Sequence, residues 1–167
     1  MRVSPVAYFA DTLDDVKKLS YAVTSVSHNH PEGIKGAEAT AVAIFLALQG
    51  KTKEEIKNYI VKNYYPLKFT LDEIRPTYTF DVSCQGSVPQ ALEAFFESND
   101  FEDAIRNAIS IGGDSDTIAA ITGGVAEAYY GVPDEIKHFA GEKLGPTLRM
   151  CLAKIEKAIS RRSKVTE

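Results

Sequence analysis

Oxygen-bearing side chains cluster behind a pair of glycines in the segment Gly112-Gly113-Asp114-Ser115-Asp116-Thr117. Carboxylate and hydroxyl oxygens are the ligands that hard cations such as Mg²⁺, Mn²⁺ and Ca²⁺ prefer. A D-x-D spacing at a turn allows Asp114 and Asp116 to converge on one ion, and glycine permits close approach of the backbone. The segment is therefore a candidate metal site, in which Asp114 and Asp116 offer carboxylate oxygens and Thr117 offers a hydroxyl.

The same carboxylates also fit a purely structural role. Asp114 and Asp116 stand where a helix of small and apolar residues is about to begin. Aspartate is a common N-cap, and the helix dipole favours an anion at that end. Spacing alone leaves the metal site and the helix cap both open.

A second polar cluster, Ser27 to Gly33, contains His28, His30 and Glu32. Two histidines separated by one residue can bind a transition metal or a substrate, and a glutamate can serve as an acid or a base. The alternative is a polar turn between two helices, with Pro31 setting the break. Both interpretations remain open, since functional residues concentrate on loops.

The third candidate is Cys84, which precedes Gln85-Gly86-Ser87. A thiol near a helix N-terminus can be a nucleophile, but no base accompanies this one in the sequence. A structural cysteine ahead of a capping serine is the favoured interpretation. The only other cysteine is Cys151, and no C-x-x-C pair or secretory leader is present. We therefore expect a reducing cytoplasm and no disulfide.

Helical periodicity predicts the elements that position these residues. Asp11 or Thr12 caps the first long helix, which runs to Val26. A strongly apolar helix follows from Gly33 to Leu48, closed by Gly50, and a capping box of Thr52 and Glu55 opens the next.

The second half of the sequence continues the pattern. The predicted elements are a short helix at Leu71–Ile74, an extended loop at Tyr78–Val82, a helix capped by Ser87 with Pro89 in its first turn, a helix opened by Asp100 or its neighbours, and helices at Asp116–Tyr130, after Pro133 and from Pro146 to Ile159. The basic end, Arg161 to Lys164, is interpreted as a solvated helix end. With no paired strand, the prediction is an all-α fold.

Composition narrows the class of protein. The chain has 167 residues, of which 44% are hydrophobic and 25% charged, which suits a single globular domain over 1–167. The net charge is −4 and no basic stripe is present, so no nucleic-acid partner is expected. The longest largely apolar run, Ala39 to Leu48, is far shorter than the roughly twenty residues that span a bilayer, so no membrane association is expected.

Four segments, in order, resemble the ADP-ribosylglycohydrolases, which are related to the dinitrogenase-reductase-activating glycohydrolases. They are S-H-x-H-P-E-x-x-K-G-A from Ser27, S-V-P-x-A-L-x-A-F from Ser87, F-E-x-A-I-R-x-A-I from Phe101, and G-G-D-S-D-T-I-A-A-I-T-G-G-V-A-E-A-Y-Y-G from Gly112. Together they extend over nearly the whole chain.

The resemblance implies an all-α orthogonal helical bundle that binds two Mg²⁺ or Mn²⁺ ions. It implies cleavage of the glycosidic bond between ADP-ribose and a protein side chain, often arginine. By this resemblance Asp114, Asp116 and Thr117 correspond to metal ligands. By the same resemblance, His28 corresponds to a histidine that contacts bound ADP-ribose, and His30 is a second candidate for such a contact. Paired metals in such a site orient the ribose hydroxyls and activate water.

The sequence also departs from the family pattern. The family carries an acidic residue, a T-D-D motif and a G-N-G-x-x-M-R stretch upstream of the matched segments, and only Met1-Arg2 of that stretch is present. We therefore expect the C-terminal part of the fold, with at most one weakly bound ion, and a chain that alone is inactive or weakly active.

Two other functions remain compatible with the sequence. One is a non-catalytic binding or assembly module, and the other is one half of a split enzyme. Removing part of a helical bundle exposes apolar helix faces, and large exposed apolar patches favour association with another protein surface. We therefore expect a homo-oligomer.

Overall fold

The structure is a computed structural model that describes residues 1–163. Within these residues it contains ten helices and no strand, so the predicted all-α class is confirmed. The chain divides into two compact units, Met1–Gly131 and Val132–Glu167. Of the predicted basic end, Lys164 and the side chains of residues 162 and 163 lie outside the described part.

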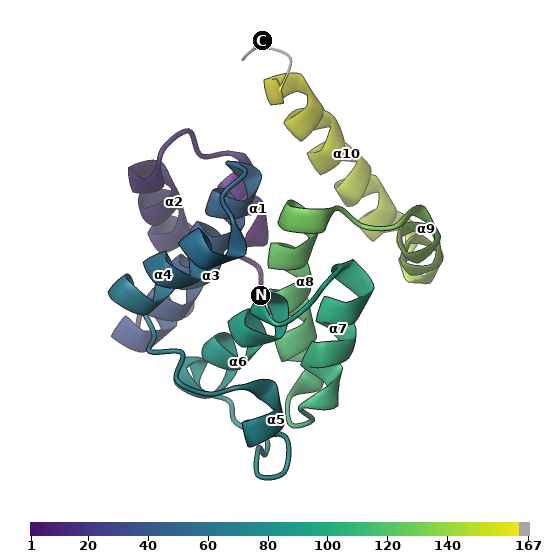
Figure 1. The fold of residues 1–167 in the computed structure, drawn as a ribbon. Coiled ribbons are helices and arrows are strands. Elements are labelled where there is room, and N and C mark those ends of the chain that lie inside the picture. The colour runs from purple at the N-terminus through teal and green to yellow at the C-terminus, as the bar shows by residue number, and fades with distance from the viewer. Residues whose placement is uncertain (164–167) are drawn as a thin grey trace. The chain divides into compact units, whose positions relative to one another are not determined.

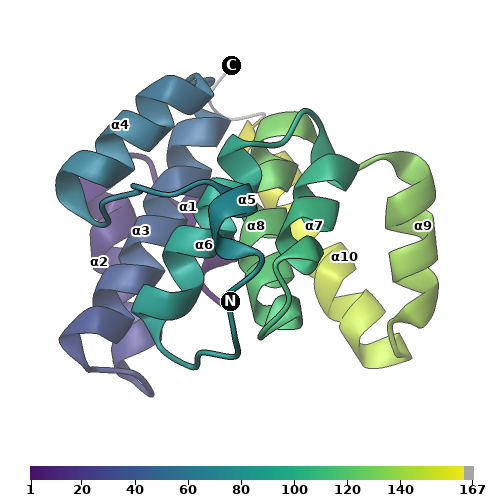
Figure 2. The same ribbon diagram turned by 60° about the horizontal axis from the view of Figure 1, so that its bottom comes forward.

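The first unit contains eight helices, which are shown in Figures 1 and 2. They are α1 (Ser4–Tyr8), α2 (Leu13–Ser25), α3 (Pro31–Leu48), α4 (Lys53–Asn63), α5 (Leu71–Ile74), α6 (Cys84–Phe96), α7 (Phe101–Ser110) and α8 (Ser115–Tyr130).

Helix α3 is the centre of this unit and contacts α1, α2, α4, α6 and α8 (Figure 1). Its residues from Ala39 to Ala47 are all buried, as expected of a helix that is apolar on every side. Helix α6 packs on α3, α7 and α8, and contributes the fully buried Leu92 and Phe95. The core therefore lies where α3, α6 and α8 meet.

Several helix starts agree with the sequence prediction. Thr12 caps α2 by accepting a hydrogen bond from the Asp15 backbone N–H at 3.1 Å. Asp100 caps α7 by accepting from the Asp103 backbone N–H at 2.8 Å. Residues 78–82 form an extended loop, also as predicted.

The predicted start of α6 is wrong. Helix α6 begins at Cys84, and its cap is Ser83, whose Oγ accepts a hydrogen bond from the Gly86 backbone N–H at 3.0 Å. Ser87 lies inside the helix and donates from its Oγ to the Ser83 carbonyl at 2.8 Å. Pro89 consequently lies beyond the first turn. Both Ser83 and Ser87 precede the apolar run of this helix. Ser83 comes earlier in the chain and already caps the Gly86 backbone N–H, so the helix begins before Ser87.

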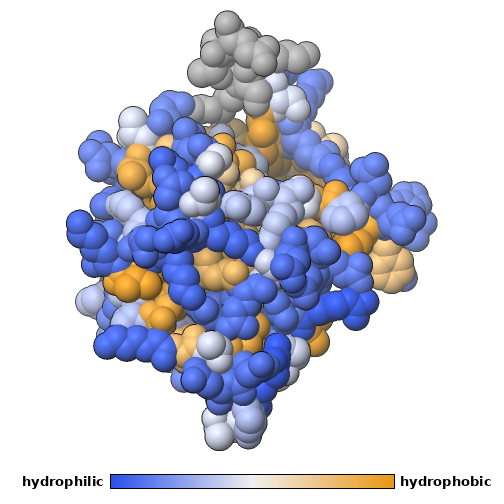
Figure 3. Space-filling model, viewed as in Figure 1, coloured by the Kyte–Doolittle hydropathy of each residue, from blue (hydrophilic) through white to orange (hydrophobic). Residues whose placement is uncertain are grey.

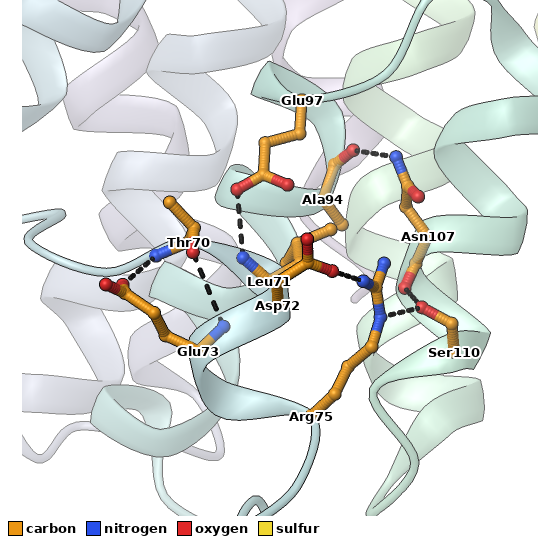
Figure 4. Close-up of polar contacts among 9 residues, drawn as sticks. All are labelled: Thr70, Leu71, Asp72, Glu73, Arg75, Ala94, Glu97, Asn107 and Ser110. Atoms are coloured by element: carbon orange, nitrogen blue, oxygen red, sulfur yellow. Dashed lines mark hydrogen bonds and ion pairs between the residues drawn. The ribbon is translucent and has the colours of Figure 1, made fainter.

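The short helix α5 is fixed to α6 and α7 by polar contacts (Figure 4). The Leu71 backbone N–H donates to Glu97 Oε1 at 2.9 Å, and Arg75 Nε donates to Ser110 Oγ at 2.9 Å. The Tyr78 backbone N–H in turn donates to the Ile74 carbonyl at 2.8 Å. Anchoring α5 therefore also places the loop that carries Tyr78.

An ion pair joins α4 to α6. Lys57 Nζ lies 2.6 Å from Glu93 Oε1, and the Glu93 side chain is only 3% exposed. The second carboxylate oxygen, Oε2, is buried and has no hydrogen-bond partner among the described residues. Burial raises the pKa of Glu93, and the hydrogen bond from Lys57 opposes that rise.

The second unit is a hairpin of α9 (Asp134–Lys143) and α10 (Pro146–Ser163). None of the described side chains from Val132 to Arg161 is buried. On the face of the molecule drawn in Figure 3, hydrophobic residues occur as separate patches among hydrophilic ones. No helix in residues 1–163 combines the length and apolar character needed to cross a bilayer.

The predicted capping box of α4 is present and allows a stability test. Thr52 Oγ1 accepts from the Glu55 backbone N–H at 3.2 Å, and Glu55 Oε2 accepts from the Thr52 backbone N–H at 2.9 Å. Thr52→Ala removes one of these partners and is expected to lower the free energy of unfolding by about 1 kcal/mol, measured by urea denaturation. Thr77→Ala, at an exposed threonine outside any helix, is the control; equal losses in both variants would contradict the capping role.

Candidate functional site

The first unit contains a pocket of about 450 Å³. Its walls come from the start of the chain, the end of α2 and the first turns of three longer helices. The residues that line it are Met1, Arg2, Val3, Thr24, His28, Gly33, Gly36, Ala37, Thr40, Val82, Ser83, Cys84, Ser87, Val88, Asp114, Thr117 and Ile121.

Three helix N-termini converge on this pocket. Gly33 lies in the first turn of α3, Cys84 begins α6, and Thr117 lies in the first turn of α8. Each helix N-terminus presents backbone N–H groups and a partial positive charge, which together favour an anionic ligand. The guanidinium of Arg2 adds a full positive charge to the same wall.

The predicted metal segment forms the turn into α8. Gly112 and Gly113 both adopt left-handed backbone conformations, with φ of +79° and +63°. Asp114 occupies the N-cap position of α8, yet its side chain makes no capping hydrogen bond. The capping interpretation therefore does not account for this carboxylate, which faces the pocket together with Thr117.

Asp116 lies on the exposed side of the same turn and is not among the residues that line the pocket. A hydrogen bond with the Asp114 carboxyl group, and then the Thr117 backbone N–H at 3.0 Å, lower the pKa of Asp116. It is therefore an anion at neutral pH.

These oxygen donors fit a hard cation such as Mg²⁺ or Mn²⁺ rather than a soft metal. All of them come from one turn. Nowhere in residues 1–163, this turn included, do three or more histidine, cysteine, aspartate or glutamate side chains converge in a way that could hold a metal ion. The described residues thus offer a partial ligand set.

The two predicted ligand-contacting histidines occupy different positions. His28 lines the pocket, whereas His30 is the N-cap of α3 and accepts a hydrogen bond at its Nδ1 from the Glu32 backbone N–H at 3.3 Å. Ser27 Oγ lies 2.7 Å from His28 Nδ1 and accepts a hydrogen bond from Arg2. The contact with Ser27 holds the His28 ring through Nδ1, which leaves Nε2 as the ring nitrogen without a protein hydrogen-bond partner among the described residues.

Tyr78 is a site residue that the sequence prediction missed. Its hydroxyl donates to the Gly86 carbonyl at 2.6 Å, which joins the 78–82 loop to the start of α6. Its ring lies against Gly113, where a Cβ atom would come within 2.5 Å of Tyr78 Cε1. Tyr78 therefore supports the turn that presents Asp114.

Cys84 forms part of the pocket floor, where α3 and α6 cross closely. A Cβ atom at Gly36 would lie 3.0 Å from Cys84 Cβ and 3.2 Å from Val88 Cγ2. Burial raises the pKa of the Cys84 thiol, which keeps it protonated. Both cysteines are free, and Cys151 is exposed on α10.

Comparison with known proteins adds to this geometry. Residues 1–162 match the sequence profile of a family described as ADP-ribosylglycohydrolase. ADP-ribosylarginine hydrolase Tri1 of Pseudomonas putida (strain GB-1) is 32% identical over 139 residues, which covers 79% of this chain and 38% of that protein. ADP-ribosylhydrolase ARH3 of Homo sapiens is 25% identical over 178 residues, which covers 79% of this chain and 49% of ARH3.

A solved structure described as an ADP-ribosylglycohydrolase-related protein complex has a similar fold. The TM-score is 0.64 at 24% sequence identity, and the match covers 95% of this chain and 56% of the other. The chain thus spans less than half the length of the two relatives above and little more than half of this structural neighbour.

Proposed function

This chain belongs to the ADP-ribosylglycohydrolase family, and from that premise we propose that it binds the ADP-ribose group of a modified protein in the pocket between α3, α6 and α8. The observation that carries the proposal is the convergence of three helix N-termini and Arg2 on one pocket. The diphosphate of ADP-ribose is an anion that such a wall favours.

His28 is the residue proposed to contact this ligand directly. Ser27 holds the ring through Nδ1, so Nε2 is the ring nitrogen that we propose hydrogen-bonds to an oxygen of the ligand. His30 acts through the start of α3, whose first N–H groups it caps. Its contribution is to hold the helix end that faces the anion.

Asp114, Asp116 and Thr117 are proposed to hold one Mg²⁺ or Mn²⁺ ion. Asp114 and Thr117 supply oxygens from the pocket side, and Asp116 supplies a carboxylate from the same turn. Such an ion contributes charge stabilisation and lowers the pKa of bound water. The protein's own contribution is to fix the turn, through Gly113 and Tyr78, and to orient the ligand through His28.

We expect the isolated chain to hydrolyse ADP-ribosyl-arginine weakly or not at all. Mg²⁺ requires near-octahedral oxygen geometry, and one turn supplies only part of that shell. An assay for ADP-ribose release from ADP-ribosyl-arginine in Mg²⁺ or Mn²⁺ tests this, with Tri1 as the reference enzyme. Rates equal to those of Tri1 would contradict the proposal. Binding without turnover would favour a binding module, and activity restored by a second polypeptide would favour a split enzyme.

Ligand binding gives a separate test that does not depend on turnover. In isothermal titration calorimetry, His28→Ala is expected to weaken ADP-ribose binding by about tenfold or more, the result of losing one charge-complementary hydrogen bond. His138→Ala, at the exposed histidine on α9, is the matched control and is expected to leave the affinity unchanged. Asp114→Ala should abolish any dependence of the affinity on Mn²⁺. Equal affinities in all variants would place the ligand elsewhere.

A further inference from the structure

The hairpin of α9 and α10 carries large apolar side chains that face water. Phe139 on α9 is 62% exposed, and Leu148 and Ile155 on α10 are 59% and 38% exposed. Leu152 on α10 is 42% exposed. Exposed apolar side chains that gather into a patch mark an interaction site.

Three of the four large apolar residues that are exposed on α10 form one stripe, and the fourth, Met150, lies on another side of the helix. Leu148, Leu152 and Ile155 follow one another at spacings of four and three, which places them on the same face of the helix. We refer to these three residues as the α10 stripe. This 4-3 spacing is the pattern by which helices pair along an apolar seam.

Charged residues of opposite sign border the α10 stripe on the side of α9. Arg149 donates from Nε to the Leu144 carbonyl and from Nη2 to the Glu142 carbonyl, both at 2.8 Å. Glu156 accepts from Lys137 through Oε1, at 2.9 Å. These contacts hold both side chains along a groove of about 550 Å³ between the two helices.

We propose that the α10 stripe pairs with the α10 stripe of a second copy of this chain, in antiparallel orientation about a twofold axis. Leu152 then packs on Ile155 of the partner subunit, and the reciprocal contact follows from the symmetry. On one flank Arg149 faces Glu156 of the partner subunit. On the other flank Cys151 faces Ala158 of the partner subunit, and both are small enough to allow close packing.

The charges select this orientation over the parallel one. In a parallel pair the same positions bring Arg149 toward Leu144 of the partner subunit and Glu156 toward Cys151 of the partner subunit. Neither contact pairs opposite charges. Only the antiparallel arrangement matches Arg149 with Glu156 on both sides of the twofold axis, and both side chains are already ordered by contacts within the hairpin.

Sedimentation velocity of the full chain over a range of concentrations tests the interface. We expect a monomer–dimer equilibrium that Leu148→Glu with Ile155→Glu shifts to monomer, while circular dichroism retains its helical signal. The matched control is Leu19→Glu with Val23→Glu on α2, where both residues are 37% exposed. This control should still dimerise. A monomeric wild type, or dissociation by the α2 variant alone, would overturn the proposal.

Cross-linking tests the orientation. In a Cys84→Ser background, one chain keeps Cys151 and a second, differently tagged chain carries Cys151→Ser with Ala158→Cys. After mixing, a short bis-maleimide is expected to join the two different chains faster than it joins identical ones. Equal rates for all pairs would exclude the antiparallel pairing. Neither experiment requires ADP-ribose or metal, so both are independent of the proposed function.

Discussion

Replacing Gly113 with alanine is expected to remove metal-dependent ligand binding and to destabilise the fold. The new Cβ would lie 2.5 Å from Tyr78 Cε1 and 3.0 Å from the Thr79 carbonyl, in a residue whose φ is +63°. Left-handed strain and overpacking together predict a loss of about 2–4 kcal/mol in the free energy of unfolding. Because Asp114 is the next residue, the displaced turn should also lose the Mn²⁺ affinity that we propose for it, which electron paramagnetic resonance can measure.

Gly112 supplies a matched control for this prediction. It shares the left-handed conformation, with φ of +79°, but no atom lies within 4 Å of the position its Cβ would take. Gly112→Ala is therefore expected to cost only about 1 kcal/mol, from the backbone strain. Adding Tyr78→Ala to Gly113→Ala should recover part of the Mn²⁺ affinity by removing the clash. Identical behaviour of the two glycine variants would show that contact with Tyr78 does not support the turn.

Lys57→Met is expected to be the most destabilising single change of a charged residue in the first unit. Among the described residues, it removes the one cation paired with the buried Glu93 carboxylate, whose Oε2 already lacks a hydrogen-bond partner there. An uncompensated buried charge, discounted for the partial exposure of Lys57, predicts a loss of about 2–4 kcal/mol at pH 8. Urea denaturation measures it. Lys62→Met, at an exposed lysine on the same helix, should change the free energy of unfolding by less than about 0.5 kcal/mol.

The pH dependence of this loss identifies its cause. The folded-state pKa of Glu93 is raised above its ordinary value of 4.5. The destabilisation from its charge is therefore absent below pH 4.5 and develops as the pH rises through the elevated pKa. Because Lys57→Met raises that pKa further, the difference between variant and wild type should shrink on moving from pH 8 to pH 5. A difference that stays constant over this range would mean that lost packing, rather than the charge of Glu93, causes the instability.

The helices could be predicted from the sequence because their caps are local. Thr12, Thr52 and Asp100 each accept a hydrogen bond from a backbone N–H three residues later, so type and spacing were sufficient. The start of α6 could not be predicted in the same way. Ser83 and Ser87 satisfy similar local rules, and the choice between them depends on the backbone geometry of the preceding loop.

The candidate site was predictable only in part. The resemblance named His28, Asp114 and Thr117, and the fold brings these three to one pocket. The glycine pair before Asp114 indicated a close approach, but nothing in the sequence identified Tyr78 as the group that approaches. The contact between Tyr78 and Gly113 depends on hydrogen bonds that tie α5 to Glu97 and Ser110, and so fix the loop that follows α5. The spacing of residues along the sequence does not encode these contacts. His30 was named beside His28, but it caps α3 and is not among the residues that line the pocket.

The crossing of α3 and α6 at Gly36 has a consequence for which molecules can enter. The two helices touch there without a side chain on α3 between them, and the side chains of Cys84 and Val88 on α6 fill the contact. Close packing leaves these side chains little room to change rotamer, so a ligand with added bulk at that end is expected to be rejected by its shape. Rejection by shape is insensitive to ionic strength, unlike the proposed attraction of a diphosphate to the helix ends, which salt would screen. Selectivity among nucleotides should thus persist in high salt even where affinity has fallen.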